Sequence, residues 1–202
     1  MEKKGFDQAG VKELLLQALE TERGGIKIYE AAIKAAVNPD LRNEFQEYLA
    51  QTRRHEEVLT KVFMDLGLDT EEMSPGRAVC AHNGSALVAA IEMALQNASP
   101  AGAELVACEC VVLAETKDHT NWELIGKVAE AADDTLAAVL KAAYDEVEDD
   151  EDHHLYHTKG WCRELWIQTL GMPAVLPPPE EVKQVGTAIG AARAEQARAD
   201  LL

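Results

Sequence analysis

Ionisable residues recur at matching distances from predicted turns, and this repetition leaves the chain few folds to adopt. Glu115 and Glu151 each lie 18 residues from Asp133. Earlier in the chain, Glu22 and His55 lie 16 and 17 residues on either side of a second predicted turn. If each turn joins antiparallel helices, each hairpin brings its two ionisable residues to one level. The spacing therefore predicts two helical hairpins with ionisable residues at matching heights.

The composition favours helices over sheets. Hydrophobic residues make up 47% of the 202 residues, but aromatic residues only 5%. Strands prefer β-branched and aromatic side chains, which are scarce here. The predicted fold is all-α: a four-helix bundle with one long crossover that contains a short helix, followed by a C-terminal helical extension.

Four long stretches carry apolar residues at steps of three and four, the period of helices that bury one face. In each, the apolar face becomes ionisable near its middle. The predicted bundle helices span residues 8–36, 40–66, 101–132 and 134–170, and the crossover helix spans residues 85–96. Gly24 and Gly25 weaken the first helix by roughly 1 kcal/mol each. Their presence predicts the close approach of a neighbouring helix or a ligand.

The C-terminal part of the chain differs in composition from the bundle. Gly171 ends the last predicted bundle helix, and Pro177, Pro178 and Pro179 indicate a stiff, extended linker. We therefore predict a bundle domain at residues 1–171 and an extension at residues 172–202. In the extension, residues 180–202 are predicted to be helical. This helix has a weak apolar face, formed by Val182, Val185 and Ile189. The helix either docks on a partner subunit through this face or frays.

The charge excludes several classes of partner. With a net charge of −17, the chain has no basic stripe for nucleic acid and disfavours anionic membrane surfaces. No apolar run approaches the roughly 20 residues of a membrane-spanning helix. The start, Met1–Gly5, leads into no apolar signal core, and the four cysteines form no Cys-x-x-Cys pair. We expect a cytoplasmic protein with reduced thiols and an acidic surface that attracts cations.

Glu151 and His154 form a Glu-x-x-His pair, which suits metal binding. Residues three apart lie on one face of a helix, so both side chains reach one centre. Two divalent ions need anionic oxygen ligands to offset their charge and imidazoles to complete their coordination. Glu22 and Glu115 would supply carboxylates from two other helices. Buried carboxylates without cations would cost several kcal/mol each, so this pattern predicts a metal site inside the bundle.

With these residues the chain resembles the ferritin-like di-iron or di-manganese carboxylate proteins, in the neighbourhood of rubrerythrins and manganese catalases. It is also similar, more loosely, to stress-associated bacterial ferritin-like proteins. The resemblance covers roughly residues 8–66 and 101–170, and it implies Fe or Mn, two ions or one, as cofactor. It also implies a tyrosine beside the metals, at Tyr29. Carried over residue by residue, the implied ligands are Glu22, His55, Glu115, Glu151 and His154.

The chain departs from the family pattern at Thr52, where a glutamate is expected three residues before His55. The missing carboxylate leaves three arrangements open: one ion, two weakly held ions, or another residue as ligand. Asp118 and His119 are the candidates for that ligand, although His119 also suits a hydrogen-bonded place in the core. A further pair, His153 and His157, lies four residues apart and is expected to flank the site on the outer face; the alternative is a second metal site.

The resemblance implies an oxidoreductase that uses iron or manganese against peroxide or O₂ in stress defence. The alternative is a non-catalytic stress or scaffold protein that retains a partial metal site, which the departure at Thr52 favours. A homo-oligomer, most simply a dimer, is expected. Because the chain lacks cysteine pairs of the rubredoxin type, an electron donor would be a separate protein. The same bundle serves many activities, so the fold alone does not decide between these functions.

Overall fold

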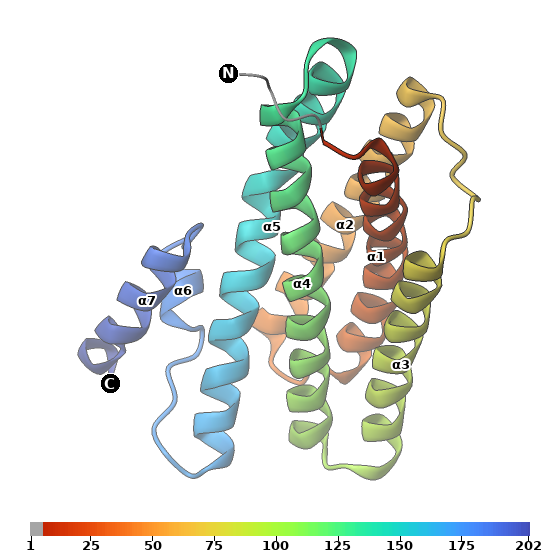
Figure 1. Cartoon of the computed structure of the whole chain (residues 1–202). Coiled ribbons are helices and arrows are strands. Elements are labelled where there is room, and N and C mark those ends of the chain that lie inside the picture. The colour runs from red at the N-terminus through yellow and green to blue at the C-terminus, as the bar shows by residue number, and fades with distance from the viewer. Residues whose placement is uncertain (1–5) are drawn as a thin grey trace.

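The computed structural model describes residues 6–202, and in this range it contains helices and no strand. Residues 1–5, where no export signal is expected, lie outside the described part. Four helices form a bundle and a fifth, α3, packs on its outside against α1 and α4 (Figure 1). This arrangement confirms the predicted all-α fold. The five long helices are α1 (Gln8–Ala35), α2 (Pro39–Leu66), α3 (Pro75–Asn97), α4 (Pro100–Ala131) and α5 (Asp134–Thr169).

The predicted boundaries of the bundle helices agree with the structure to within one residue, because local capping signals set them. The Asn38 side chain accepts hydrogen bonds from the first backbone N–H groups of α2. Ser99 does the same for α4. Gly67, in the left-handed conformation with φ 66°, ends α2.

The crossover helix is longer than predicted, because α3 begins at Pro75 and not at residue 85. The Ser74 side chain caps it, and Pro75 suits the first turn of a helix. Residues after Pro75 that favour turns, such as Gly84, are tolerated inside this helix because α3 packs closely on α1. A Cβ atom on Gly84 would lie 3.4 Å from the Gly24 Cα atom. The close approach predicted at Gly24 is therefore confirmed, and the neighbour is a helix.

The outer side of α3 is apolar and exposed. Only a narrow face, formed by Arg77, Ile91 and Ala94, is buried. Val79 and Met93 are 58% and 64% exposed. Among the described helices, α3 alone is long and apolar enough to cross a membrane, and one such helix is weak evidence for a membrane. The predicted compartment stays a prediction.

Two apolar clusters fill the bundle, and polar residues separate them. One cluster contains Tyr29, Phe45 and Trp161, and the other contains Leu59 and Trp122. Along each bundle helix, the residues between the two clusters include buried ionisable side chains. These are Glu22 on α1, His55 on α2, Glu115 and Asp118 on α4, and Glu151 and His154 on α5. The bundle therefore encloses a layer of ionisable side chains between two apolar layers.

The C-terminal segment folds differently from the prediction. Instead of one helix over residues 180–202, it forms α6 (Pro179–Val182), α7 (Ala188–Gln196) and a 3₁₀ helix (Ala197–Leu201). The single helix was wrong because Thr187 caps a new helix start at α7. Of the predicted apolar face, only Val185 is buried.

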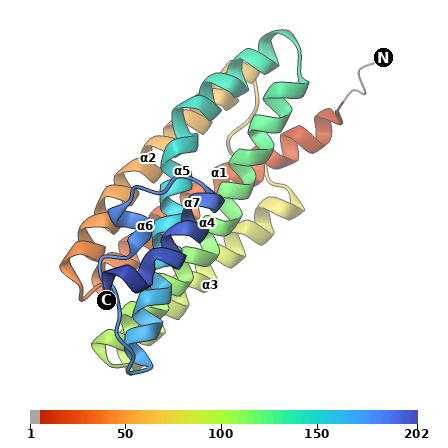
Figure 2. The same cartoon turned by 90° about the vertical axis from the view of Figure 1, so that its left-hand side faces the viewer.

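The segment lies across α5 of its own chain (Figure 2). Arg163 on α5 donates two hydrogen bonds to the buried Glu180 carboxylate, at 2.6 and 2.9 Å. Arg198 donates to Glu164, also on α5. These ion pairs hold the segment against the bundle. The division into domains at residues 1–171 and 172–202 stays a prediction.

Candidate metal centre

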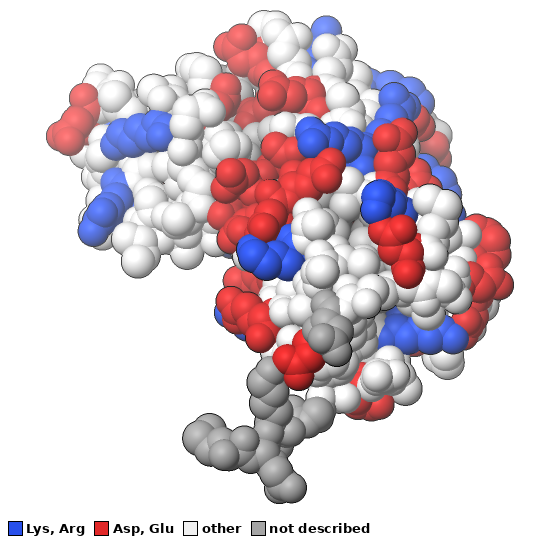
Figure 3. Space-filling model, turned by 90° about the horizontal axis from the view of Figure 1, so that it is seen from above, with Lys and Arg blue, Asp and Glu red and all other residues white. Residues whose placement is uncertain are grey.

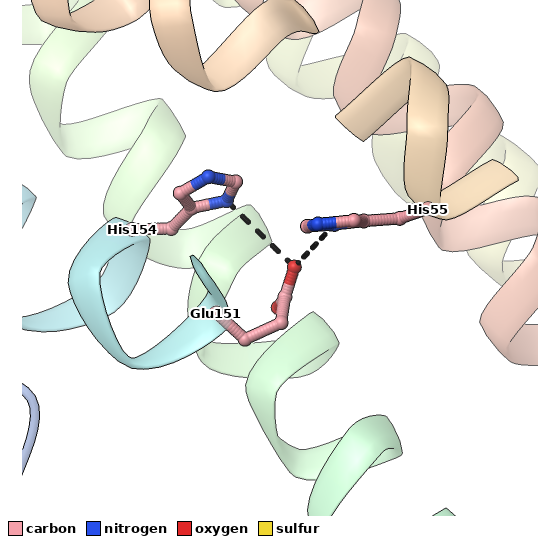
Figure 4. A group of neighbouring side chains, drawn as sticks. All are labelled: His55, Glu151 and His154. Atoms are coloured by element: carbon pink, nitrogen blue, oxygen red, sulfur yellow. Dashed lines mark ion pairs between the residues drawn. The ribbon is translucent and has the colours of Figure 1, made fainter. Parts of the chain in front are cut away.

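Two buried histidines, one on α2 and one on α5, point at the same carboxylate oxygen. His55 Nδ1 lies 3.0 Å from Glu151 Oε1, and His154 Nδ1 lies 3.7 Å from the same atom (Figure 4). The two imidazole rings stack with their centroids 5.6 Å apart. All three residues are at most 2% exposed. Residues predicted to share one level from their spacing therefore meet in the bundle interior.

Hydrogen bonds on the outer side of each ring determine which nitrogen carries the proton. His55 Nε2 lies 3.3 Å from Asp150 Oδ2, and His154 Nε2 lies 2.9 Å from the amide oxygen of Gln51. Carboxylate and amide oxygens can only accept, so each Nε2 donates. In the neutral ring, the Nδ1 lone pair then faces inward, with no hydrogen-bond partner among the described residues. This is the tautomer that a metal ion requires.

The sequence did not reveal these outer partners. Asp150 lies in an acidic run that reads as a solvated face, and Gln51 precedes a position where a ligand was expected. Gln51 lies one turn before His55 on α2, but no spacing in the sequence links it to His154 on α5, which it contacts.

Two further carboxylates come from α1 and α4. Glu22 Oε1 lies 3.8 Å from His55 Nδ1 and accepts a 2.8 Å hydrogen bond from the Trp122 indole. Glu115 Oε2 lies 3.5 Å from His154 Nδ1. Both glutamates are buried, and the second oxygen of Glu22 has no hydrogen-bond partner in the described part of the chain. The structure therefore brings the five residues implied by the resemblance together.

Asp118, a candidate for the carboxylate missing at Thr52, lies within the cluster. One oxygen each from Asp118, Glu22 and Glu151 lies within 4.8 Å of the others. Asp118 is 4% exposed, and its Oδ1 atom has no hydrogen-bond partner among residues 6–202. The Thr52 hydroxyl instead donates to the Tyr48 carbonyl within α2, at 2.8 Å. The fourth carboxylate thus comes from α4 and not from α2.

The other two predicted residues lie at the edge of this cluster. His119, proposed as an additional ligand, points away and pairs with Asp152 at 2.8 Å. The Tyr29 ring is fully buried, 6.0 Å from the His154 ring between centroids. Its hydroxyl has no hydrogen-bond partner in the described range, and burial, followed by the charge of Glu115, raises its pKa. Tyr29 therefore lies beside the cluster.

Without a cation, the clustered carboxyl groups resist ionisation. Burial, followed by the charge of Glu115, raises the pKa of Glu151 to about 8. Burial and the neighbouring carboxylates also raise the pKa values of Glu22 and Asp118 well above their usual range. The Asp150 carboxylate behaves in the opposite way, because the hydrogen bond with His55 lowers its pKa. The interior of the bundle thus favours either protons or a positive ion at this level.

The donor atoms fit divalent metal ions in number, type and spacing. Two atoms bound about 2.1 Å from one ion at right angles lie about 3.0 Å apart, which is the distance between His55 Nδ1 and Glu151 Oε1. The Glu151 oxygen faces both imidazoles, as a shared ligand would. Four carboxylates and two imidazoles form a hard, mixed oxygen and nitrogen donor set that suits Fe²⁺ or Mn²⁺. The residues present therefore fit metal ions.

An all-α bundle with inward carboxylates and histidines is the architecture of ferritin-like metal proteins. Residues 12–110 match a family described as a domain of unknown function (DUF892), which is part of the ferritin-like superfamily. The matched segment includes Glu22 and His55 but ends before Glu115. Comparison of the chain with curated proteins and with solved structures finds no match. The resemblance is thus supported for the superfamily, and the relation to rubrerythrins or manganese catalases stays a prediction.

Proposed function

We propose that this chain is a ferritin-like oxidoreductase that holds two ions of iron or manganese and reacts with peroxide or O₂ in stress defence. One observation carries the proposal. Two buried imidazoles from different helices turn unpartnered Nδ1 atoms toward one Glu151 oxygen, and acceptors hold their Nε2 atoms outward. A buried site made only for structural polar contacts would pair those nitrogens.

Each side chain has a defined task in this proposal. Glu151 contacts both imidazoles, and together with Glu22 and Glu115 it would hold the metal. Asp118 supplies the fourth carboxylate, so the absence of glutamate at position 52 does not leave the ligand set incomplete. The bound metal would supply the one-electron chemistry that protein side chains lack.

The surroundings help the ligands to act. The two apolar clusters on either side of the layer of ionisable side chains exclude water, which strengthens its electrostatic interactions. The Trp122 indole orients Glu22, and Asp150 and Gln51 hold the imidazoles in the binding tautomer. Tyr29 places its hydroxyl beside Glu115, where it can donate a hydrogen bond to the Glu115 carboxylate.

The first test is an anaerobic titration of the metal-free protein with Fe²⁺ and with Mn²⁺. We expect two ions per chain in the wild type and loss of binding in His154→Ala. The control is His153→Ala, since His153 stacks on His157, with centroids 4.9 Å apart, and is not part of the cluster. Equal losses in both variants would mean that outer residues bind the metal.

The second test distinguishes an enzyme from a non-catalytic scaffold protein. The iron-loaded protein should consume peroxide or O₂ faster than the same iron in buffer, and stopped-flow rates would rank the two oxidants. Glu22→Ala should remove the advantage. If the purified protein carries no metal and neither rate exceeds that of free iron, the non-catalytic scaffold reading replaces this one.

A further inference from the structure

A cavity of about 200 Å³ between α4 and α5 reaches the metal centre from the outside of the bundle. At its inner end lie Glu151 and Trp122, which both belong to the centre. Glu151 is 2% exposed, and its Oε2 atom has no hydrogen-bond partner among the described residues. A buried, unpartnered ligand atom therefore belongs to a residue that lines the cavity.

The walls of this cavity are acidic. Besides Glu151 they contain Glu123, Glu148 and Asp152, and none of the described lining residues is lysine or arginine. The one basic group is the imidazole of His119, which lies 2.8 Å from Asp152 across the space between α4 and α5. Several carboxylates beside one imidazole form a surface that attracts cations and repels anions.

The C-terminal segment covers the outer end of the cavity. Gly186, Thr187 and Ala188, which join α6 to α7, line it. Seen from above, acidic side chains gather between this segment and the bundle (Figure 3). A cation that follows the potential of this surface would arrive at the mouth of the cavity.

We propose that this cavity is the route by which divalent cations reach the metal centre, with His119 and Asp152 as the transit point. The inference rests on the proposed function, since it needs a metal centre to load. It assigns a role to His119, which the ligand set does not use. It also assigns a role to Glu148 and Asp152, two members of the acidic run on α5.

A second acidic cavity, of about 400 Å³, lies on the other side of α5. It is lined by Gln51 and Tyr48, which contact His154, but by none of the proposed ligands themselves. An ion there would still have to pass these two side chains. The cavity between α4 and α5 is the shorter route because a ligand forms its inner wall.

The test measures the rate of loading separately from its equilibrium. Co²⁺, followed by its visible absorption in a stopped-flow instrument, is mixed with the metal-free, full-length protein. Asp152→Asn should lower the association rate constant by about threefold to tenfold and weaken its dependence on salt. Asp149→Asn is the matched control, because Asp149 is exposed on the same helix and does not line the cavity.

A second pair of variants tests the route without changing charge. Ala188→Trp places a large ring at the rim, and Ala192→Trp places the same ring on an exposed position of α7. Ala188→Trp should slow association and dissociation together, by at least about threefold, and leave the Kd and stoichiometry as in Ala192→Trp.

Equal association rates within both pairs would overturn the route. So would a weakened Kd with unchanged association in Asp152→Asn, because that result would make Asp152 a ligand. Failure of the wild type to bind Co²⁺ at equilibrium is a different result. It would refute the proposed metal centre, and the route with it.

Discussion

Replacing Glu151 with glutamine should stabilise the metal-free protein while it abolishes the metal centre. In the folded, metal-free chain the pKa of this buried carboxyl is raised from 4.5 to about 8. At neutral pH the carboxyl is ionised in the unfolded chain but protonated in the folded one. Folding must therefore take up a proton, and this uptake opposes folding. Glutamine has a similar shape and is neutral at every pH, so the variant avoids this cost.

The size of the effect follows from the raised pKa. At pH 7, which lies 2.5 units above 4.5, the proton uptake costs about 3 kcal/mol at about 1.36 kcal/mol per unit. In a chain of this length that corresponds to a rise in Tm of about 6–12 °C. Because the folded pKa is the higher one, the cost grows as pH rises from 4.5 and levels off above 8. At pH 5 it is below about 1 kcal/mol.

Thermal unfolding of metal-free protein at pH 5, 7 and 8 tests this prediction, with exposed Asp149→Asn as the control. Added Fe²⁺ or Mn²⁺ should reverse the order. At a free metal concentration one thousand times its Kd the wild type gains about 4.1 kcal/mol, which exceeds its cost of about 3 kcal/mol at pH 7, and Glu151→Gln gains nothing. A variant no more stable than the control at pH 7, or an advantage that does not grow with pH, would refute the argument. Glu151 would then not be buried among unneutralised carboxylates.

Four other substitutions address the ligand set and the surface. Asp118→Asn should reduce the metal content from two ions per chain to one, and Thr52→Glu in that background should restore it. Elemental analysis that still finds two ions in Asp118→Asn would remove Asp118 from the site. Trp122→Phe should weaken metal binding about 10- to 100-fold, because Glu22 loses its hydrogen bond. A titration with an unchanged Kd would mean that packing alone positions Glu22. Val79→Glu, on the exposed apolar side of α3, should convert the expected dimer to a monomer in light scattering. An unchanged mass would place any subunit contact elsewhere.

The sequence alone predicted the parts of this protein that depend on one helix at a time. Capping residues such as Asn38 mark where helices begin, and these signals are local. The spacing of three and four residues shows which side chains share a face, so Glu151 and His154 could be paired from their numbers. The distances from the turns then set the common level of Glu22, His55 and Glu115, because antiparallel helices rise equally per residue.

The predictions from the sequence were wrong where a helix has more than two neighbouring helices or where local signals conflict. On α4 the buried face is wider than a two-helix seam, because α4 contacts α1, α3 and α5. Asp118 is therefore turned inward, while His119, one residue later, lies at the edge. In the C-terminal segment, the alanine-rich composition suggested one helix, but Thr187 starts a new one.

Only the tertiary structure decided which side chains complete the cluster of carboxylates and imidazoles. The departure at Thr52 left open whether a carboxylate was lost, and the packing of α4 against α1 and α5 brings Asp118 to Glu22 and Glu151. The tautomers of the histidines depend on Gln51 and Asp150, whose contacts cross between α2 and α5. The periodicity of the sequence determines the direction in which each side chain points around the axis of its own helix. The rotation and distance between two helices depend on how all their side chains pack together, and no local pattern encodes them.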